Sequence, residues 1–431
     1  MESRVNTQVY RQRRERPDLL GERSPEGLRV TQISADAERP HSHIYMEARV
    51  FTPDSRRFVF QRFLDPDDVD TRSSRREYLL CDIEDGYSFI QLTDEEGAIG
   101  PSVSPDGRYM YYFIDRTRAG GGWWAIKRVD LDSFQRETLA RFDGPLPEAG
   151  RHLSLLYGTS SISSDGARLC MAGYLGDGRT HNAPWGLVVF DVERADVSLI
   201  FAGQSFCNIH HQYSRSKDPE ESHDILLQDN HGCDVDELGN IVTLASGKGA
   251  DVHVIRDDGS DFRCYAFGRD GVETCQGHQA WRGEQMSVVA SMAIESEERY
   301  PLLEARAVRA EPGTMHHGRL IPGATRNRIS RSMEREDSCH FAFDPSGTRF
   351  VSDTFGYRGR HANCVIYVGV LPDEPDAALR TSYLLHPRSS FGHSQHTHPH
   401  PFQSPDGSVV LFNSDESGLP QIYAVEDFEY P

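Results

Sequence analysis

The sequence lacks the features that mark membrane proteins, disulfide-rich secreted domains and nucleic-acid-binding proteins. It has no apolar run of about 18 residues, so we expect no membrane-spanning helix. Its eight cysteines stand singly, without a Cys-x-x-Cys pair, which favours reduced thiols and a cytoplasmic location. The net charge is -20 and no basic block follows residue 27. We therefore expect binding neither to nucleic acid nor to anionic membranes.

The amino-terminal segment, residues 1–26, is charged but has no apolar core. We therefore expect a flexible tail rather than a secretory signal or a nucleic-acid-binding arm. Residues 27–431 carry the fold.

Helical periodicity is also scarce, since no such apolar pattern lasts beyond two or three turns. A turn recurs instead: an apolar residue, then Ser/Thr/Asp-Pro-Asp-Gly or a variant, then an alternating strand. The clear copies are FTPDSRRFVF (51–60), VSPDGRYMYYF (103–113), ISSDGARLCMA (162–172), FDPSGTRFVSD (343–353) and QSPDGSVVLFN (403–413). Two degenerate copies are SRSKDPEESHDILL (214–227) and WRGEQMSVVAS (281–291).

These seven turns predict an all-β fold, a seven-bladed β-propeller. Pro and Gly preset the backbone of a tight turn between antiparallel strands, and most copies are followed by a second hairpin. Two hairpins make one four-stranded blade, and seven blades close a ring. The last repeat ends early, so we expect the strand GLRVTQIS (27–34) to complete the final blade and close the ring.

Histidines recur at one position of the repeat, six residues before the Asp of the turn. Four successive repeats place an imidazole there, and the first three place small or polar residues there instead. The histidines are His210, His278, His340 and His400, and the other three residues are Ala48, Gly100 and Thr159. If the strand before each turn lines the channel, these four imidazoles lie at one depth on one side of it.

The segment FGHSQHTHPH (391–400) adds to this cluster. His398 and His400 are two residues apart, so on an extended strand both point to the same face. Imidazoles with an oxygen donor suit Mn, Fe, Co, Ni or Zn, and the absence of a thiolate argues against a purely structural zinc site. The alternative for any single histidine is a hydrogen-bonded structural role, and the role of His231 is left open.

The run SQHTHPHPFQSPDGSVVLFNSDESGLPQIYAV (394–425) resembles the carboxyl-terminal signature of the oligogalacturonate lyases, metal-dependent seven-bladed propellers. The shared features are a Gln-x-x-His-Pro-His core, the Pro-Asp turn and a Ser-Asp pair. Weaker similarities lie in TCQGHQAW (274–281), SCHFAFDPSGT (338–348) and NIHHQYSR (208–215).

The resemblance implies a role for each matching residue. A manganese-like ion would be bound by His278, Gln395, His398 and His400, and His210 would be the catalytic base. His340, Tyr213 and Arg215 would contact the substrate. The implied reaction is β-elimination on a uronic acid, as in pectin degradation. There a Lewis-acid metal stabilises the charge that forms as a base removes the C5 proton.

The sequence lacks an arginine that the family has. The strand PWGLVVFDV (184–192) has none where the family has one, and in NIHHQYSR Ser214 precedes the displaced Arg215. Arginine binds carboxylates bidentately, so this change bears on the substrate more than on the metal.

We therefore predict a carbon–oxygen lyase that acts on a short anionic oligosaccharide or a related sugar acid. The alternatives are a metal-dependent enzyme with another sugar acid or another reaction, hydrolysis or isomerisation, and a non-catalytic propeller that binds protein or sugar. The sugar, the identity of the metal and the oligomeric state are left open.

Overall fold

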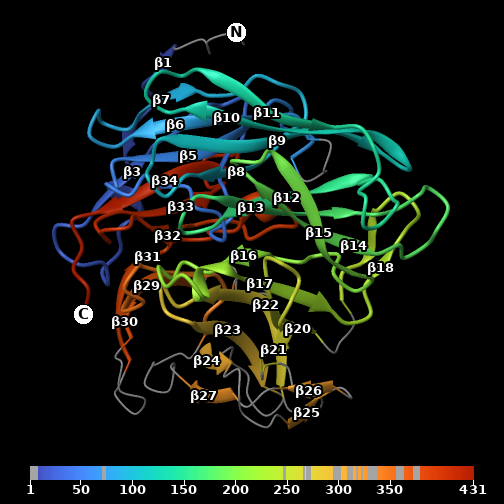
Figure 1. The fold of residues 1–431 in the computed structure, drawn as a ribbon. Helices are drawn as coiled ribbons and strands as arrows, with labels where there is room; N and C mark the ends of the chain where they lie inside the picture. Colours follow the sequence, from blue (N-terminus) through green and yellow to red (C-terminus); the bar gives the residue numbers. More distant parts are fainter. Residues whose placement is uncertain are drawn as a thin grey trace.

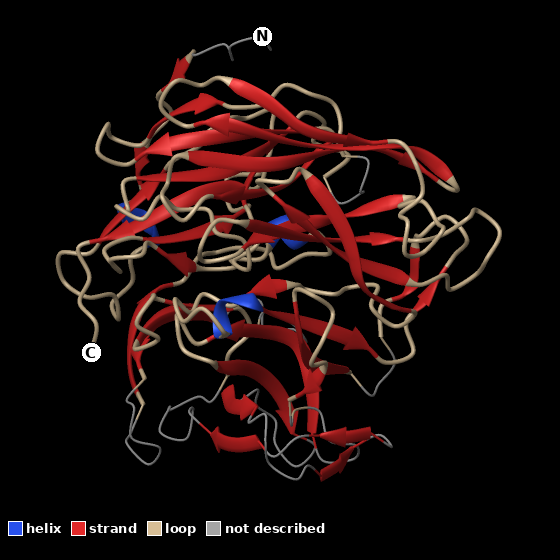
Figure 2. Ribbon diagram, viewed as in Figure 1, coloured by secondary structure: helices blue, strands red, loops and turns tan. Residues whose placement is uncertain are grey.

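In the computed structural model of the chain, the regular secondary structure is almost entirely β-strand (Figure 2). It describes residues 8–69, 74–245, 249–265, 267, 273–294, 302–307, 314–316, 319–321, 324–328, 337–355, 364–371 and 379–431. In these ranges the helical segments are three short 3-10 helices: η1 (Pro17–Leu19), η2 (Glu221–His223) and η4 (Gln395–Thr397). None of the described helices has the length and apolar character needed to cross a membrane.

The strands form antiparallel sheets whose first strands contact those of neighbouring sheets (Figure 1). Strand β12 (Leu155–Ile162) contacts β8 (Ala98–Val103) and β16 (Gln212–Tyr213), and β28 (Phe341–Phe343) contacts β22 (Glu273–Trp281) and β32 (Phe402–Gln403). The strand before each turn is therefore the innermost one. The fold is a β-propeller, as predicted.

The remaining strands complete these sheets in chain order. The first blade has β4 (His41–His43), β5 (Arg57–Phe63), β6 (Arg76–Asp82) and β7 (Ser88–Gln91). The second and third add β9 (Tyr109–Arg118), β10 (Gly121–Asp130), β11 (Arg136–Phe142), β13 (Arg168–Tyr174), β14 (Trp185–Asp191) and β15 (Asp196–Gly203). The fourth and fifth add β17 (Asp224–Asn230), β20 (Ala250–Arg256), β21 (Arg263–Cys264), β23 (Ser287–Ile294), β24 (Leu302–Ala307) and β27 (Ala324–Arg328).

The last two blades and two small hairpins account for the other described strands. The sixth blade adds β29 (Arg349–Asp353), β30 (Ile366–Val370) and β31 (Arg380–Leu385). The seventh adds β33 (Val410–Ser414), β34 (Gln421–Glu426) and β3 (Arg29–Gln32). The hairpins pair β18 (Asp234–Val235) with β19 (Ile241–Thr243) and β25 (Thr314–His316) with β26 (Arg319–Ile321).

The blade count depends on one contact. The described strands form six sheets of four or more strands, and one of these has eight strands. That sheet consists of two four-stranded units, each with its own repeat turn, and the pairing of β20 with β22 is a single residue pair, Ala250 with Cys275. Counted by unit, the described strands contain the seven repeats that the turns predict.

The repeated Pro and Gly have a packing role beyond the turn itself. Gly107 has φ +74°, and a Cβ at this position would lie 2.7 Å from Cδ of Pro53 in the preceding blade. Gly166 faces Pro105 in the same way, at 3.3 Å. The proline of one turn therefore packs on the glycine of the next, which stacks neighbouring blades.

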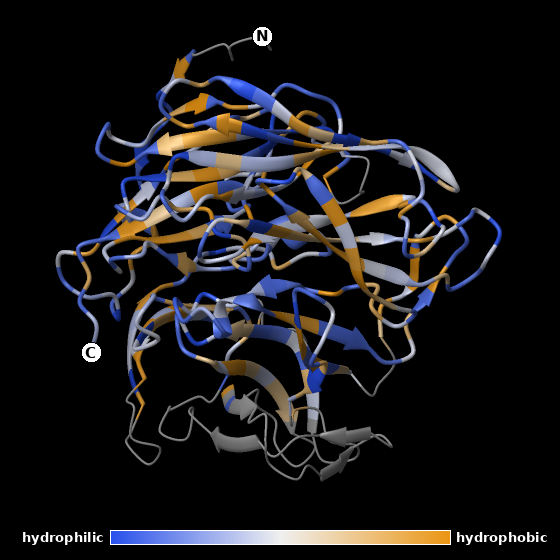
Figure 3. Cartoon of the chain, in the orientation of Figure 1, coloured by the Kyte–Doolittle hydropathy of each residue, from blue (hydrophilic) through white to orange (hydrophobic). Residues whose placement is uncertain are grey.

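The hydrophobic core lies between blades. One cluster joins Phe113 and Trp124 of the second blade to Leu169 and Val188 of the third. Figure 3 shows hydrophobic residues along the strands and hydrophilic residues in most loops. Each blade therefore buries both of its faces against its neighbours.

The ring is closed by the amino-terminal strand, as predicted. Strand β3 pairs antiparallel with the carboxyl-terminal β34 over four residue pairs, and the two lie side by side in Figure 1. Residues 8–26 differ from the expected tail, because β1 (Val9–Tyr10) extends the first blade and β2 (Arg14–Glu15) extends the last. Tyr10 stacks on Phe89, and Leu19 is buried in the core of the sixth and seventh blades. Residues 1–7 of the expected tail lie outside the described residues.

Several innermost strands bulge at one depth. In β8 the register shifts between Ile99 and Ser102, in β12 between Leu156 and Ser160, and in β22 between Cys275 and Gln279. A bulge inserts extra residues into one strand and turns their side chains away from the regular pleat. These irregular segments contain Gly100, Thr159 and His278, three of the seven positions that the repeat places at the site.

Candidate metal centre

The structure gathers four histidines from three blades. The rings of His340 and His400 are 3.9 Å apart between centroids, and those of His278 and His340 are 4.5 Å apart. His398 lies 5.5 Å from His400 and 5.8 Å from His340 by the same measure. The common register that the repeat predicts for His278, His340 and His400 is therefore real, and His340 lies at its centre.

Two sets of three ligand atoms lie within 4.8 Å of one another, and His340 belongs to both. One set is His278, Cys339 and His340, and the other is His340, His398 and His400. Nδ1 of His340 lies 2.9 Å from the Asp353 carboxylate, so it donates its proton there and only Nε2 can be a ligand. Since one nitrogen binds one ion, the two sets describe a single site.

The imidazoles of this site are held in the neutral form that binds metals. Burial, followed by repulsion from neighbouring histidines, lowers the pKa of His278 to about 3 and the pKa values of His340 and His400 well below the ordinary range. A neutral imidazole offers a lone pair, whereas an imidazolium does not.

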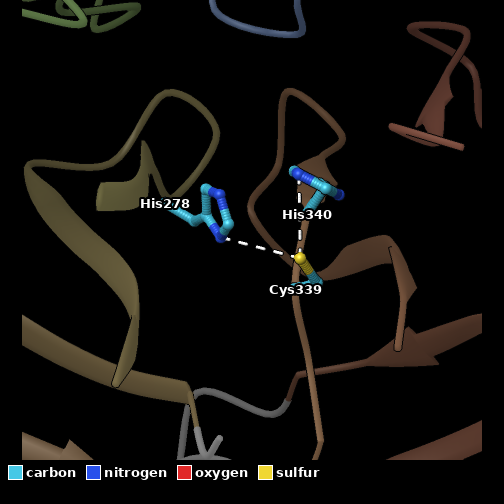
Figure 4. A group of neighbouring side chains, drawn as sticks. All are labelled: His278, Cys339 and His340. Atoms are coloured by element: carbon cyan, nitrogen blue, oxygen red, sulfur yellow. Dashed lines mark hydrogen bonds between the residues drawn. The ribbon is translucent and has the colours of Figure 1, made fainter. Parts of the chain in front are cut away.

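A thiol also lies in the cluster, contrary to the expectation of a site without one. Sγ of Cys339 is 3.7 Å from Nδ1 of His278 and 3.7 Å from Nε2 of His340 (Figure 4). The Cys339 side chain is fully buried. In a regular strand, adjacent side chains point to opposite faces, but β28 begins only at Phe341, so alternation does not separate Cys339 from His340.

His398 and His400 lie close together, but not on the extended strand that the sequence predicts. Neither residue lies in a strand: His398 caps η4 and β32 begins at Phe402. His400 has φ +43°, which turns its side chain away from an extended path. Gln395, predicted as a ligand, is exposed at the first position of η4, and its role as a ligand stays a prediction.

His210 lies apart from the cluster and is paired with a carboxylate. Its Nδ1 contacts Oε1 of Glu47, a buried residue of the first blade. Its Nε2 accepts a hydrogen bond of 2.8 Å from the amide of Asn208, whose oxygen accepts one of 2.7 Å from Tyr157. This tautomer leaves the lone pair on Nε2, the nitrogen that a general base would use.

Tyr45 contacts both His210 and two of the metal-binding histidines. Its ring centroid is 5.3 Å from that of His210, 5.0 Å from that of His400 and 6.4 Å from that of His340. Tyr45 and Glu47 belong to an irregular segment between β4 and the start of the first turn, and no sequence motif marks either residue.

Two arginines lie close to this segment. The Arg215 guanidinium donates to the carbonyl oxygen of Met46 at 3.3 Å. Burial and then repulsion from Arg49 lower the pKa of Arg215 to about 10, and burial also lowers the pKa of Arg49. The nearby carboxylate of Glu284 opposes both shifts, and it pairs with Lys217 at 2.7 Å. Two guanidiniums with so little compensating negative charge favour the binding of an anion.

Tyr213 and His231 have other surroundings. Tyr213 is fully buried and its hydroxyl donates to Asp257 at 3.2 Å, inside the fourth blade. His231 lies 3.1 Å from the carboxylate of Asp251 and 3.8 Å from that of Asp229. The structure therefore does not bring either residue to the histidine cluster, and a substrate contact of Tyr213 stays a prediction.

The cluster fits a divalent ion. Nε2 of His400 is buried and has no hydrogen-bond partner within the described ranges. An unsatisfied buried nitrogen costs free energy, which a metal bond would recover. The donor set of neutral imidazoles, with a thiol beside them, suits first-row transition metals and Zn²⁺.

Comparisons with known proteins agree with this architecture. No protein-family model and no curated protein matches the sequence. A solved oligogalacturonate lyase from Vibrio parahaemolyticus matches with TM-score 0.68 and 17% identity, over 99% of both chains. A structure described as oligogalacturonate lyase in complex with manganese matches with TM-score 0.69 and 17% identity, also over 99% of both chains. The chain therefore shares the propeller fold of the oligogalacturonate lyases over its whole described length.

Proposed function

We propose that the chain is a metal-dependent lyase that cleaves short uronic-acid oligosaccharides by β-elimination. The ion would be held by His278, His340, His398 and His400, with Gln395 as a further candidate. This assignment makes His340 a ligand in place of the substrate contact that the resemblance implies. When bound, the divalent ion supplies a Lewis acid that stabilises negative charge on a sugar carboxylate.

His210 would be the base of this reaction. Its Nε2 carries the lone pair, and Glu47 orients the ring and stabilises the imidazolium that forms. The base takes the C5 proton, the C5–H electrons become the C4–C5 double bond, and the C4–oxygen bond breaks. The departing oxygen gains a proton, so no water is added to the products.

Arg215 and Arg49 would bind the carboxylates of the substrate. The chain has a net charge of -20, so an anionic sugar needs a local positive field to enter. The two half-buried guanidiniums supply it next to the segment that carries Glu47. They also offer a replacement for the arginine that is missing from residues 184–192.

The observation that carries the proposal is that the imidazole cluster and the His210–Glu47 pair both lie against Tyr45. The test is to incubate the metal-loaded protein with oligogalacturonate and follow the ultraviolet absorbance of the unsaturated product. We expect activity that a chelator abolishes and that His210→Ala lowers about 10²- to 10⁴-fold, the usual contribution of a general base. His210→Ala is expected to keep its metal.

A matched control is His181→Ala, because His181 is exposed and pairs only with surface carboxylates, Asp234 and Glu237, in the described structure. It should leave activity unchanged. The absence of unsaturated product from any uronide, with the metal confirmed as bound, would end the proposal. Products heavier by one water would instead indicate a hydrolase, and protein that purifies without metal but binds sugar would indicate a binding module.

A further inference from the structure

Cys339 lies beside two imidazoles of the metal-binding cluster, and the proposed function assigns it no role. Its sulfur is 3.7 Å from Nδ1 of His278 and 3.7 Å from Nε2 of His340, and Figure 4 draws both contacts as dashed lines that meet at the sulfur. The two histidines come from neighbouring blades, on β22 and just before β28. The three ligand atoms form one of the two sets that lie within 4.8 Å of one another.

These separations match those of ligands on one ion. A thiolate about 2.3 Å and an imidazole nitrogen about 2.0 Å from a tetrahedral ion are about 3.5 Å apart. Both sulfur–nitrogen distances in the structure are close to this value. Without an ion the same two contacts are hydrogen bonds, in which the thiol donates to Nε2 of His340 and accepts from Nδ1 of His278.

The surroundings of the thiol are apolar, and burial raises the pKa of Cys339, so the centre without an ion holds a neutral thiol. Cys339 is fully buried, in a small core cluster with Phe355, Cys364 and Phe391. His340 presents Nε2 because its Nδ1 donates to Asp353, so both the sulfur and this nitrogen can bind the same ion.

We propose that Cys339 is a ligand of the ion and makes the centre select zinc-class ions, such as Zn²⁺ or Co²⁺, over Mn²⁺. Thiolates bind softer ions, whereas Mn²⁺ prefers oxygen donors. The inference rests on the metal centre of the proposed function but not on its reaction, because it concerns which ion is bound.

The test uses the full-length protein loaded with Co²⁺, without any sugar. We expect a thiolate-to-cobalt charge-transfer band in the near ultraviolet, together with the visible bands of the bound ion. Cys339→Ser should lose the charge-transfer band and keep the visible bands. In equilibrium dialysis against equal Mn²⁺ and Co²⁺, the wild type should hold Co²⁺, and Cys339→Ser should shift the ratio toward Mn²⁺ by about tenfold or more.

The matched control is Cys364→Ser, which removes a second buried thiol of the same core cluster, whose sulfur donates to the carbonyl oxygen of Thr354. It should keep the charge-transfer band. Stoichiometric Co²⁺ without that band in the wild type would overturn the inference, whatever the folding of the variants. A band without lyase activity would instead refute the proposed function and leave this inference intact.

Discussion

At the scale of single residues, two histidines of the site adopt a backbone conformation that L-residues rarely use. His210 has φ +46° and His400 has φ +43°. Each costs about 1–2 kcal/mol relative to an ordinary conformation. Such positions persist where surrounding contacts hold them, and here the contact of His210 is the buried Glu47. The His210–Glu47 pair therefore combines a strained backbone at His210 with a carboxylate that fixes the orientation of its ring.

The Glu47–His210 pair gives a prediction for catalysis. Glu47→Gln removes the charge that would stabilise the imidazolium, while an amide oxygen still fits the position. A charge-assisted hydrogen bond contributes about 1.5–3 kcal/mol, so kcat should fall about 10- to 150-fold. Steady-state kinetics and metal analysis on the same sample check this. The control is Glu137→Gln, because Glu137 pairs with Arg128 at the surface. Unchanged kcat in Glu47→Gln would remove Glu47 from the proposed reaction.

The sequence predicted part of this site at the residue scale. Counting back from the turns brought together His278, His340 and His400, because identical blades place equivalent residues at one depth. The same count placed His210 at that depth, but its ring contacts Tyr45 and Glu47 and belongs to neither set of grouped ligand atoms. Cys339, Tyr45 and Glu47 escaped prediction because they lie in irregular segments, where neither strand alternation nor the repeat constrains side-chain direction.

At the scale of elements, the bulges of the innermost strands place the site. Gly277 has φ +81° in the bulge of β22, one residue before His278. A Cβ there would lie 2.9 Å from the side-chain nitrogen of the buried Gln228. This glycine therefore permits both the backbone turn and the close packing beneath His278.

Gly277→Ala is expected to weaken both fold and metal binding. The left-handed conformation alone should lower the free energy of unfolding by about 1–2 kcal/mol, and displacement of His278 should lower metal affinity. Urea denaturation and metal titration measure the two effects. The control is Gly158→Ala in the bulge of β12, where φ is ordinary and no atom lies within 4 Å of the new Cβ. Equal behaviour of the two variants would show that the bulge of β22 does not position His278.

Elements differed in how well they could be predicted. The turns were found because Pro, Asp and Gly are each required by the local backbone, and Pro53 and Gly107 also pack between blades. The bulges were not found, because their sequence mark is a glycine, Gly100, Gly158 or Gly277, and a glycine within a strand has several other causes.

At the scale of the whole molecule, burial of neutral histidines makes stability depend on pH. Burial lowers the pKa of His41 to about 3 and that of His211 to about 3, from an unperturbed 6.5. The unfolded chain therefore binds more protons than the folded one between about pH 6.5 and 3. Stability is full above this window and is lost as the pH falls through it.

We accordingly expect the urea concentration at the unfolding midpoint to decrease as the pH is lowered from about 7 to about 4.5. Each such histidine should contribute up to about 1.4 kcal/mol per pH unit to the change in the free energy of unfolding. His41→Gln should reduce the dependence of stability on pH, because it removes one of the shifted groups. An amide can keep the hydrogen bond that the His41 ring makes to the carbonyl oxygen of Arg39. The exposed His181 serves as the control, since His181→Gln should leave the slope unchanged. A midpoint that does not vary over this range would contradict the expectation.

Ring closure has a consequence for the order of events during synthesis. Strand β3 is made early and β34 late, yet they pair in the same sheet. His398 and His400 emerge from the ribosome just before that last blade, long after His278 and His340. The full set of four imidazoles therefore exists only once the start of the last blade has been made. Complete coordination of an ion then requires that this blade has joined the ring.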